Sequence, residues 1–521
     1  MKTKIVIMLM ITICLLGSIF SSAVKINQES YDSQNIDSNA IAAWTIMVYL
    51  DGDNNLEYSA LDDFMEMSTV GSTADVNIVV QLDRVGGYDY SYGDWTTCKR
   101  FYVEQNMTPV AQNAMMDVGE ANMGDPQTLI DFASWSMREF PAEQYCLILW
   151  DHGSGWKEDY ESTRKDVCED DTNYDSLKLY ELKDALNSIT SSGSFKIELL
   201  GFDACLMGGI EIAYEVRDSC RYMTASEDTE PVAGWNYEDS LAVLVSNPYS
   251  IDGEILGEIF VTYYTGYELT LSTINVETLD TLTDAISNLA SSLMSNQYRS
   301  TVDTIFSGVK KYMETCDICH FALLVKENIF DYNVNDYADE VIFELQNTVT
   351  SEMHDYYEEN SYGLSIYLPY WEYDSDYSYI DFSSNSLWDD FLIYMFEGSG
   401  DSNPPSEPRI SGLSQGKIGE VYAYNFESMD PDGDEIYYVI DWGDGSQHVR
   451  IGPKATGTEI QADHTWTVEG GYVIKAKATD TNGASSEWSM FNIMMPKSRV
   501  LNRNIFNNAF IRSLFSKFFS F

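Results

Sequence analysis

Positive charge is scarce in this 521-residue sequence. The chain has 30 lysines and arginines against 83 aspartates and glutamates, which gives a formal net charge of −53. Nucleic-acid binding depends on clustered basic side chains, so this balance excludes general affinity for DNA or RNA. It favours cationic partners, although solvation of the surface at high salt explains the same excess of acid.

Long apolar runs are missing beyond the first residues. The run at residues 5–20 follows two lysines and precedes small residues, which is the build of a secretory signal peptide. We therefore predict a signal peptide at residues 1–23, a leader at residues 24–42, and a secreted, extracellular or cell-surface protein. A retained N-terminal anchor is the alternative.

Cysteine is also infrequent, and its number is informative. Cys14 belongs to the predicted signal peptide, so seven cysteines remain: Cys98, Cys146, Cys168, Cys205, Cys220, Cys316 and Cys319. An odd number in an exported chain leaves at least one outside any disulfide, and that thiol is a candidate reactive group. The alternative is that several are small buried side chains.

Short apolar runs alternate with longer amphipathic segments in the first half of the chain. This alternation is typical of strands and helices in an α/β sheet. The expected strands are residues 44–50, 77–82, 145–150, 197–202 and 222–225, and the expected helices are residues 56–67, 126–140, 177–189 and 207–216. Further helix and some strand follow, and we assign residues 43–397 to one large domain.

The C-terminal part has a different pattern after a linker at residues 398–405. Apolar residues alternate in period two between turns rich in aspartate and glycine, which predicts a small antiparallel β-sandwich at residues 406–496. This part resembles a PKD or immunoglobulin-like module, chiefly through the Trp-Gly-Asp-Gly turn at residues 442–445.

Two of the expected strands run directly into polar turns. The first turn carries His152 and Gly153, and the second carries Asp203 and Cys205. In open parallel sheets ligands bind beyond the carboxyl ends of the strands, so both turns lie where chemistry is expected. Of the five histidines in the chain, His152 alone follows an apolar strand inside such a glycine-rich turn.

These turns offer what hydrolysis of a peptide bond by a thiol needs: a thiol, a nearby base, and donors for the developing oxyanion. His152 and Cys205 are the candidate catalytic pair, and the backbone N–H groups of Gly153 and Cys205 are the candidate oxyanion donors. A helix expected to begin near Met207 would lower the pKa of Cys205 through its positive end.

Four segments, in the same order along the chain, are similar to the clostripain family of cysteine peptidases: residues 44–57 (WTIMVYLDGDNNLE), 149–156 (LWDHGSGW), 201–207 (GFDACLM) and 363–369 (GLSIYLP). The resemblance implies a caspase-like fold, in which a mostly parallel sheet is flanked by helices, and cleavage after Arg or Lys. It also implies that calcium or self-cleavage often assists activation. By this match His152 is the general base and acid, and Cys205 is the nucleophile.

A preference for a basic residue requires a carboxylate at the floor of the substrate pocket. Asp203, two residues before the candidate nucleophile, matches the family's specificity acid. Glu227 or Asp228, which follow the expected strand at residues 222–225, could supply a second carboxylate. A solvated acidic surface is the alternative for those two residues.

The chemistry requires no cofactor, but the hard oxygen ligands that calcium prefers gather at two places. One is the turn with Asp51, Asp53, Asn54 and Asn55, and the other is the acidic turn at residues 430–434. Turn chemistry explains both equally well, so the metal question is open at this point.

A further metal pattern is incomplete. Residues 316–320 (CDICH) look like half of a zinc or redox site without a second half, so a local disulfide or buried thiols are favoured.

Arg164 and Lys165 lie between the two turns in a polar segment. An enzyme that cuts after Arg or Lys could cut itself there, so we predict maturation at these residues, and protein or peptide substrates with Arg or Lys. The alternatives are a non-catalytic adhesin on a peptidase-like body and a peptidase of another specificity.

The basic amphipathic tail at residues 497–521 suits a membrane surface or cell envelope, docking on the acidic body, or an export or anchoring role.

Overall fold

The computed structural model describes residues 41–157, 167–295, 297–369, 373–396, 403–446, 448–480 and 484–495. The predicted signal peptide, the basic tail and most of the linker lie outside these ranges. Among the helices in these ranges, none combines the length and apolar character needed to cross a membrane.

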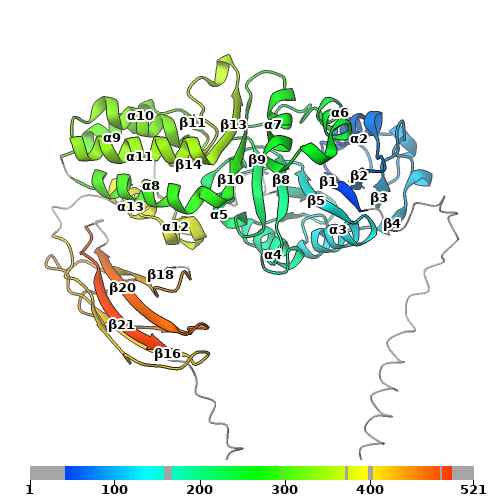
Figure 1. Ribbon diagram of the computed structural model, residues 1–521. Helices are drawn as coiled ribbons and strands as arrows, with labels where there is room; N and C mark the ends of the chain where they lie inside the picture. Colours follow the sequence, from blue (N-terminus) through cyan, green and yellow to red (C-terminus); the bar gives the residue numbers. More distant parts are fainter. Residues whose placement is uncertain are drawn as a thin grey trace, which may run out of the picture. The chain divides into compact units, whose positions relative to one another are not determined.

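One nine-stranded sheet organises the larger part of the chain, in the order β13-β10-β9-β8-β5-β1-β2-β3-β4 (Figure 1). The five strands from β9 to β2 run parallel, and the two strands at each edge are antiparallel to their neighbours. The strands are β1 (Ala42–Gly52), β2 (Val76–Arg84), β3 (Cys98–Tyr102), β4 (Met116–Gly119), β5 (Ala142–Trp150), β8 (Ile197–Asp203), β9 (Cys220–Ala225), β10 (Thr270–Asn275) and β13 (Val349–His354).

Helices cover both faces of this sheet. On one face lie α3 (Pro126–Glu139), α4 (Leu179–Ile189) and α5 (Ile210–Val216), and on the other lie α2 (Glu57–Val70), α6 (Tyr237–Ser246) and α7 (Gly253–Tyr263) (Figure 1). The packing of strand β1 on both faces of the sheet explains why its sequence is continuously apolar. Met47 and Tyr49 pack into the first core, whereas Ile46 and Val48 pack into the second, because side chains of a strand alternate between faces.

The remaining helices of this part extend the first core beyond the sheet. Residues of α8 (Leu279–Leu293), α9 (Arg299–Gly308), α10 (Ile318–Asn328), α11 (Tyr332–Thr348), α12 (Asp381–Asn385) and α13 (Trp388–Phe396) belong to it. Two small antiparallel sheets complete the part: β6 (Val167–Asp170) with β7 (Asp175–Leu177), and β11 (Lys311–Tyr312) with β12 (Thr315–Asp317) and β14 (Ser365–Tyr367).

The C-terminal part consists of two antiparallel sheets around a separate aromatic core that includes Tyr424, Trp442 and Trp466. One sheet holds β15 (Arg409–Ser411), β16 (Tyr422–Glu427) and β19 (Ile460–His464), and the other holds β18 (Val449–Lys454), β17 (Ile436–Asp441), β20 (Gly470–Asp480) and β21 (Ser489–Met495). The period-two pattern in the sequence thus corresponds to strands, as expected.

The five strands and four helices predicted for the first half are all present, and one boundary matters for function. Helix α5 begins at Ile210, so the expected start near Met207 is wrong. Leu206 has a positive φ of 64°, and Gly208 packs so closely on the backbone of Ser226 that a Cβ would lie 2.6 Å from a backbone atom. The chain therefore turns sharply after Cys205 before the helix can begin.

Candidate active site

His152 and Cys205 lie at the same edge of the central sheet. Strands β5 and β8 are parallel neighbours in which Trp150 pairs with Asp203, so each candidate residue follows its strand by two positions. Both side chains line one pocket of about 120 Å³. Its other lining residues are Leu56, Trp150, Asp151, Asp203, Ala204, Glu230, Pro231, Val232 and Gly234.

Cys205 differs from the other cysteines in exposure. All seven cysteines of the described residues are thiols, so the chain has no disulfide in this part, and only Cys205 among them is not buried. The backbone N–H of Glu230 donates to its Sγ at 3.2 Å. Such a donor stabilises the thiolate, which is the nucleophilic form of cysteine. Disulfide parity therefore does not single out Cys205, because none of the seven cysteines forms a disulfide, and the other six are buried thiols, which was the alternative.

The delayed start of α5 removes one expected influence on Cys205. Five positions separate the thiol from Ile210, the first residue of the helix, and the field of a helix end acts only over about one turn. The backbone N–H of Glu230, rather than the N-terminal end of α5, is therefore the group that stabilises a thiolate at Cys205.

The His152 ring is held by a residue from a distant segment. Its Nε2 lies 2.9 Å from Oδ1 of Asn55, which precedes α2. The neighbouring Asn54 donates from Nδ2 to Asp151 at 2.6 Å, so the same turn contacts two successive residues beyond β5. Asn54 and Asn55, which the sequence offered as candidate metal ligands, therefore contact Asp151 and His152 at the active-site edge of the sheet.

Gly153 packs directly on the backbone of Cys205. A Cβ at Gly153 would lie 2.3 Å from the carbonyl oxygen of Cys205 and 3.1 Å from its nitrogen. The two backbone segments that carry the candidate oxyanion donors can approach this closely only because residue 153 has no side chain.

Gly153→Ala is expected to lower kcat/KM about 100-fold, because displacing the reacting groups by about 1 Å has an effect of that size. Steady-state kinetics, with circular dichroism to check folding, measure it. Gly308→Ala is the matched control, since a Cβ there meets nothing within 4 Å. Unchanged kinetics in Gly153→Ala would contradict the close packing of the two segments.

Asp203 is a buried residue of the pocket lining. Its Oδ2 accepts hydrogen bonds from the hydroxyl of Tyr237 at 2.8 Å and from the backbone N–H of Trp235 at 3.3 Å. Burial raises its pKa to about 6, and a side-chain hydrogen bond with Glu230, together with those from Tyr237 and Trp235, partly offsets the effect. Gly234 leaves the space free, since a Cβ there would lie 3.1 Å from a carboxylate oxygen of Asp203.

Glu230 is a second pocket acid that the sequence analysis missed. Both of its carboxylate oxygens are buried, and its carboxyl interacts with the side chains of Asp203 and Trp235. Burial raises the pKa of this carboxyl, and the charge of Asp203 raises it further. Its position shortly after β9 could have indicated it, but Glu227 and Asp228 lie nearer the strand end and were chosen as candidates instead.

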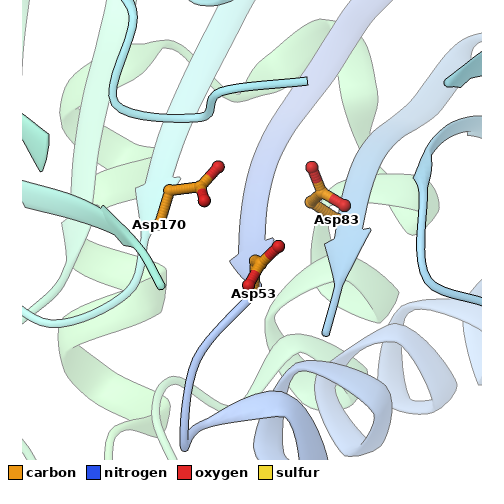
Figure 2. Close-up of side chains that lie close together, drawn as sticks. All are labelled: Asp53, Asp83 and Asp170. Carbon is orange, nitrogen blue, oxygen red and sulfur yellow. The ribbon is translucent and has the colours of Figure 1, made fainter. Parts of the chain in front are cut away.

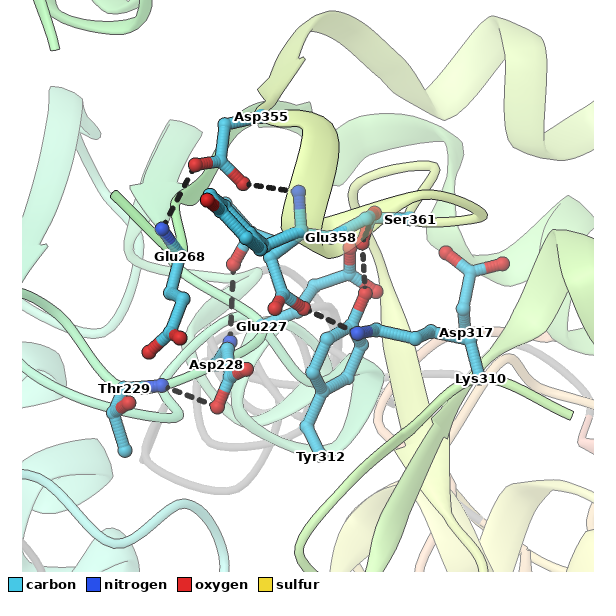
Figure 3. A network of polar contacts seen from close by, with 12 residues as sticks. Glu227, Asp228, Thr229, Glu268, Lys310, Tyr312, Asp317, Asp355, Glu358 and Ser361 are labelled. Carbon is cyan, nitrogen blue, oxygen red and sulfur yellow. Dashed lines mark hydrogen bonds and ion pairs between the residues drawn. The ribbon is translucent and has the colours of Figure 1, made fainter. Parts of the chain in front are cut away.

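Glu227 and Asp228 lie outside the pocket lining. Glu227 is buried and accepts a hydrogen bond from the N–H of Gly363 at 2.9 Å, while the Asp228 carboxylate accepts from the N–H of Thr229 at 2.7 Å. Figure 3 shows both within a polar network that also contains Lys310, paired with Glu358. The structure therefore does not bring these two acids together with Cys205.

The CDICH segment holds thiols and no disulfide. Cys316 and Cys319 are buried, and His320 accepts the backbone N–H of Lys310 on Nδ1 at 2.9 Å. The two groups of potential metal ligands found in the described residues do not include this segment. The sequence favoured either a local disulfide or buried thiols, and the structure shows buried thiols.

The oxygen ligands that the sequence offered for a metal, without a prediction that one binds, are only partly grouped. Asp53 lies with Asp83 and Asp170, each offering a carboxylate oxygen within 4.8 Å of the others (Figure 2). The turn acids Asp430, Asp432 and Asp434 form a second such group in the C-terminal part. Arg164 and Lys165, the candidate self-cleavage residues, lie outside the described residues.

A cysteine and a histidine at adjacent ends of parallel strands, on a sheet covered by helices on both faces, are the arrangement of a caspase-like cysteine peptidase. The comparisons with known proteins agree with this class. The model of the clostripain family matches residues 48–395, which is most of the chain, and the chain belongs to that family.

A curated relative is clostripain from Hathewaya histolytica. It is 27% identical over 397 residues, which cover 62% of this chain and 74% of that protein.

Two solved structures share the fold of the larger part. A secreted C11 cysteine protease from Bacteroides thetaiotaomicron, in complex with an irreversible peptide inhibitor, is 18% identical and covers 67% of this chain and 99% of its own, with a TM-score of 0.50. An inactive zymogen C11 protease from Parabacteroides distasonis is 17% identical and covers 66% and 98%, also with a TM-score of 0.50.

The C-terminal part is similar to a PKD domain. The matched protein is the PKD domain of an M14-like peptidase from a Thermoplasmatales archaeon, 44% identical over 18% of this chain and 99% of that chain, with a TM-score of 0.18.

Proposed function

We propose that this cysteine endopeptidase is secreted and cleaves after Arg or Lys, with Cys205 as the nucleophile and His152 as the general base and acid. One observation carries the proposal: a single pocket is lined by His152, Cys205 and two acids, the buried Asp203 and Glu230, whose carboxylate oxygens are buried. The first two residues supply the chemistry, and the acids supply the selectivity.

The first chemical step uses the contacts around His152. When Nε2–H donates to Asn55 Oδ1, the proton is fixed on Nε2 and Nδ1 is left as the base. Nδ1 takes the proton of Cys205, and the N–H of Glu230 stabilises the resulting thiolate. The thiolate then attacks the carbonyl carbon of the scissile bond and forms a C–S bond.

The tetrahedral intermediate places a negative oxygen beside Cys205. The backbone N–H groups of Gly153 and Cys205 are the proposed donors to it. Collapse breaks the C–N bond, and the protonated His152 gives its proton to the leaving amine. A water deprotonated by His152 then hydrolyses the thioester and regenerates the thiol.

Selectivity for Arg or Lys follows from the charge of the pocket floor. Asp203 is buried, and the carboxylate oxygens of Glu230 are buried beside it. A guanidinium or ammonium group would donate hydrogen bonds to these oxygens and neutralise the acids. A neutral side chain would leave these acids without a compensating charge.

Activity against Arg substrates is expected to depend on pH through Asp203. Its pKa is raised to about 6, so below that pH the acid is protonated and no longer attracts a cation, and kcat/KM should fall about tenfold per pH unit. The buried neighbours Asp63 and Glu230 share this titration. The ratio of kcat/KM for an Arg peptide to that for a Gln peptide removes any pH dependence common to both substrates. This ratio is expected to fall below about pH 6 in the wild type and to be smaller and less dependent on pH in Asp203→Asn, and an unchanged ratio profile in the variant would contradict the assignment.

Maturation at Arg164 or Lys165 remains part of the proposal, because the segment matches the proposed selectivity. Purified wild-type protein and Cys205→Ala are compared by gel and by N-terminal sequencing. Identical bands and N-termini would exclude self-cleavage. Calcium as an activator and envelope contact through the tail at residues 497–521 are also proposed.

A panel of fluorogenic peptides tests the proposed function. The secreted form, reduced and with calcium, is incubated with peptides that end in Arg, Lys, Asn or Asp before the reporter. Turnover confined to Arg and Lys is the expected result. Turnover only after Asn or Asp would contradict the role of Asp203.

A further inference from the structure

We infer that Asp53, Asp83 and Asp170 form a binding site for a divalent cation that ties three chain segments together and so holds the turn that orients His152. The three residues come from the turn after β1, from β2 and from β6, at the edge of the sheet that carries the active site (Figure 2). The binding claim is independent of the proposed function, whereas the effect on His152 rests on it.

The geometry suits one ion between the three side chains. All three residues are buried, and one carboxylate oxygen of each lies within 4.8 Å of the others. Oxygens that bind the same calcium ion at about 2.3–2.6 Å lie no more than about 5 Å apart. No rearrangement of the strands is therefore needed to bring the three ligands onto one ion.

An unsatisfied oxygen within this group points to a ligand. Asp83 is fully buried, its Oδ1 accepts the N–H of Arg84 at 2.7 Å, and its Oδ2 has no hydrogen-bond partner among the described residues. Asp51, two residues before Asp53, has a buried Oδ2 that also has no hydrogen-bond partner among the described residues. A buried carboxylate oxygen without a partner is costly, and a cation offsets this cost.

Nearby basic side chains are engaged elsewhere. The guanidinium of Arg84 pairs with Glu57 at 2.7 Å and donates to the carbonyls of Asp89 and Ser91. The charges that act most strongly on Asp83 are those of other carboxylates. The group thus concentrates negative charge without an internal counter-charge, which is the setting of a cation site.

The donor set favours calcium over magnesium. Carboxylates are hard oxygen ligands that bind calcium through one or both oxygens. Magnesium retains several waters and is usually bound through one or two carboxylates, so a buried set of three acids suits it less well.

The site connects to His152 through short links. Asp53 is followed by Asn54 and Asn55, which contact Asp151 and the ring of His152. Its carbonyl oxygen also accepts the N–H of Asp171, at the end of β6. A cation bound here would fix both sides of the His152 turn, because β6 begins at Val167, which bridges to Gly153. It acts as a positioning element and does not touch the substrate.

Calorimetric titration with Ca²⁺ tests the site in full-length Cys205→Ala, which prevents self-proteolysis. Adding Asp83→Asn is expected to remove one binding event or weaken it at least tenfold. The matched control adds Asp432→Asn instead, which lies in the acidic group at residues 430–434. This variant should retain the binding event that Asp83→Asn removes. Equal titrations for Cys205→Ala with and without Asp83→Asn would overturn the inference, and a parallel Mg²⁺ titration of equal or greater affinity would overturn the choice of ion.

Crystals of Cys205→Ala soaked in Tb³⁺ provide a second measurement if Asp83→Asn does not fold. The expected result is an anomalous peak at about 2.3–2.6 Å from oxygens of Asp53, Asp83 and Asp170. A peak at residues 430–434 with none between these three acids would overturn the site.

The link to His152 has its own readout, the rate at which iodoacetamide alkylates Cys205. In the protein with an intact Cys205, chelation or Asp83→Asn is expected to slow alkylation at least fivefold, and Asp432→Asn is not. If calcium binds between the three acids but the rate does not change, the positioning role is wrong while the cation site stands.

Discussion

Cys205→Ala is expected to lower kcat by at least about 10⁴-fold, because removing the nucleophile of a covalent hydrolase leaves only substrate binding and the oxyanion donors. The thermal midpoint should change little, since Cys205 is not buried. Stopped assays with an Arg peptide and high enzyme concentration measure the residual rate.

Cys220→Ala is the matched control for that substitution. Cys220 is fully buried, so its loss should lower stability while kcat is retained. If the two variants lose activity equally, or if Cys205→Ala remains active, the assignment of the nucleophile is wrong.

Asp203→Asn is expected to lower kcat/KM for Arg peptides about 10²- to 10⁴-fold, because removing one partner of a buried charge pair costs about 3–5 kcal/mol. The amide can still accept from Tyr237, so folding should be preserved. Kinetics with matched Arg and Gln peptides measure the change, and the Gln peptide should lose much less.

Glu227→Gln is the control for this prediction. Glu227 is also a buried acid at the end of β9, but it lies outside the pocket and its pKa is raised by burial and by Asp317, so a neutral amide is a close replacement. Its selectivity should match the wild type. A larger loss for Glu227→Gln than for Asp203→Asn would reverse the roles of these two acids.

The parts of the site that the sequence predicted are those set by strand ends. His152 and Cys205 each follow a strand whose apolar run is visible in the sequence, and neighbouring parallel strands must place their ends at one edge. Asp203 follows for the same reason. The fold class could be predicted because buried parallel strands are continuously apolar, as in β1.

The contacts between distant segments could not be predicted from one sequence. Asn55 reaches His152, and the N–H of Glu230 reaches Cys205, through loops whose paths depend on packing. The group of Asp53, Asp83 and Asp170 joins three segments, and only Asp53 lay in a recognisable cluster. The start of α5 was misplaced because the tight turn after Leu206 depends on contacts with Ser226 rather than on local propensity.

Covalent labelling tests the central claim most directly. The wild-type protein is treated with a peptidyl chloromethyl ketone that ends in Arg and with the same reagent ending in Gln, and the modified peptide is identified by mass spectrometry. We predict stoichiometric labelling of Cys205 by the Arg reagent, much slower labelling by the Gln reagent, and no labelling in His152→Ala on the same time scale. Labelling at another cysteine, or equal rates for the two reagents, would contradict the account.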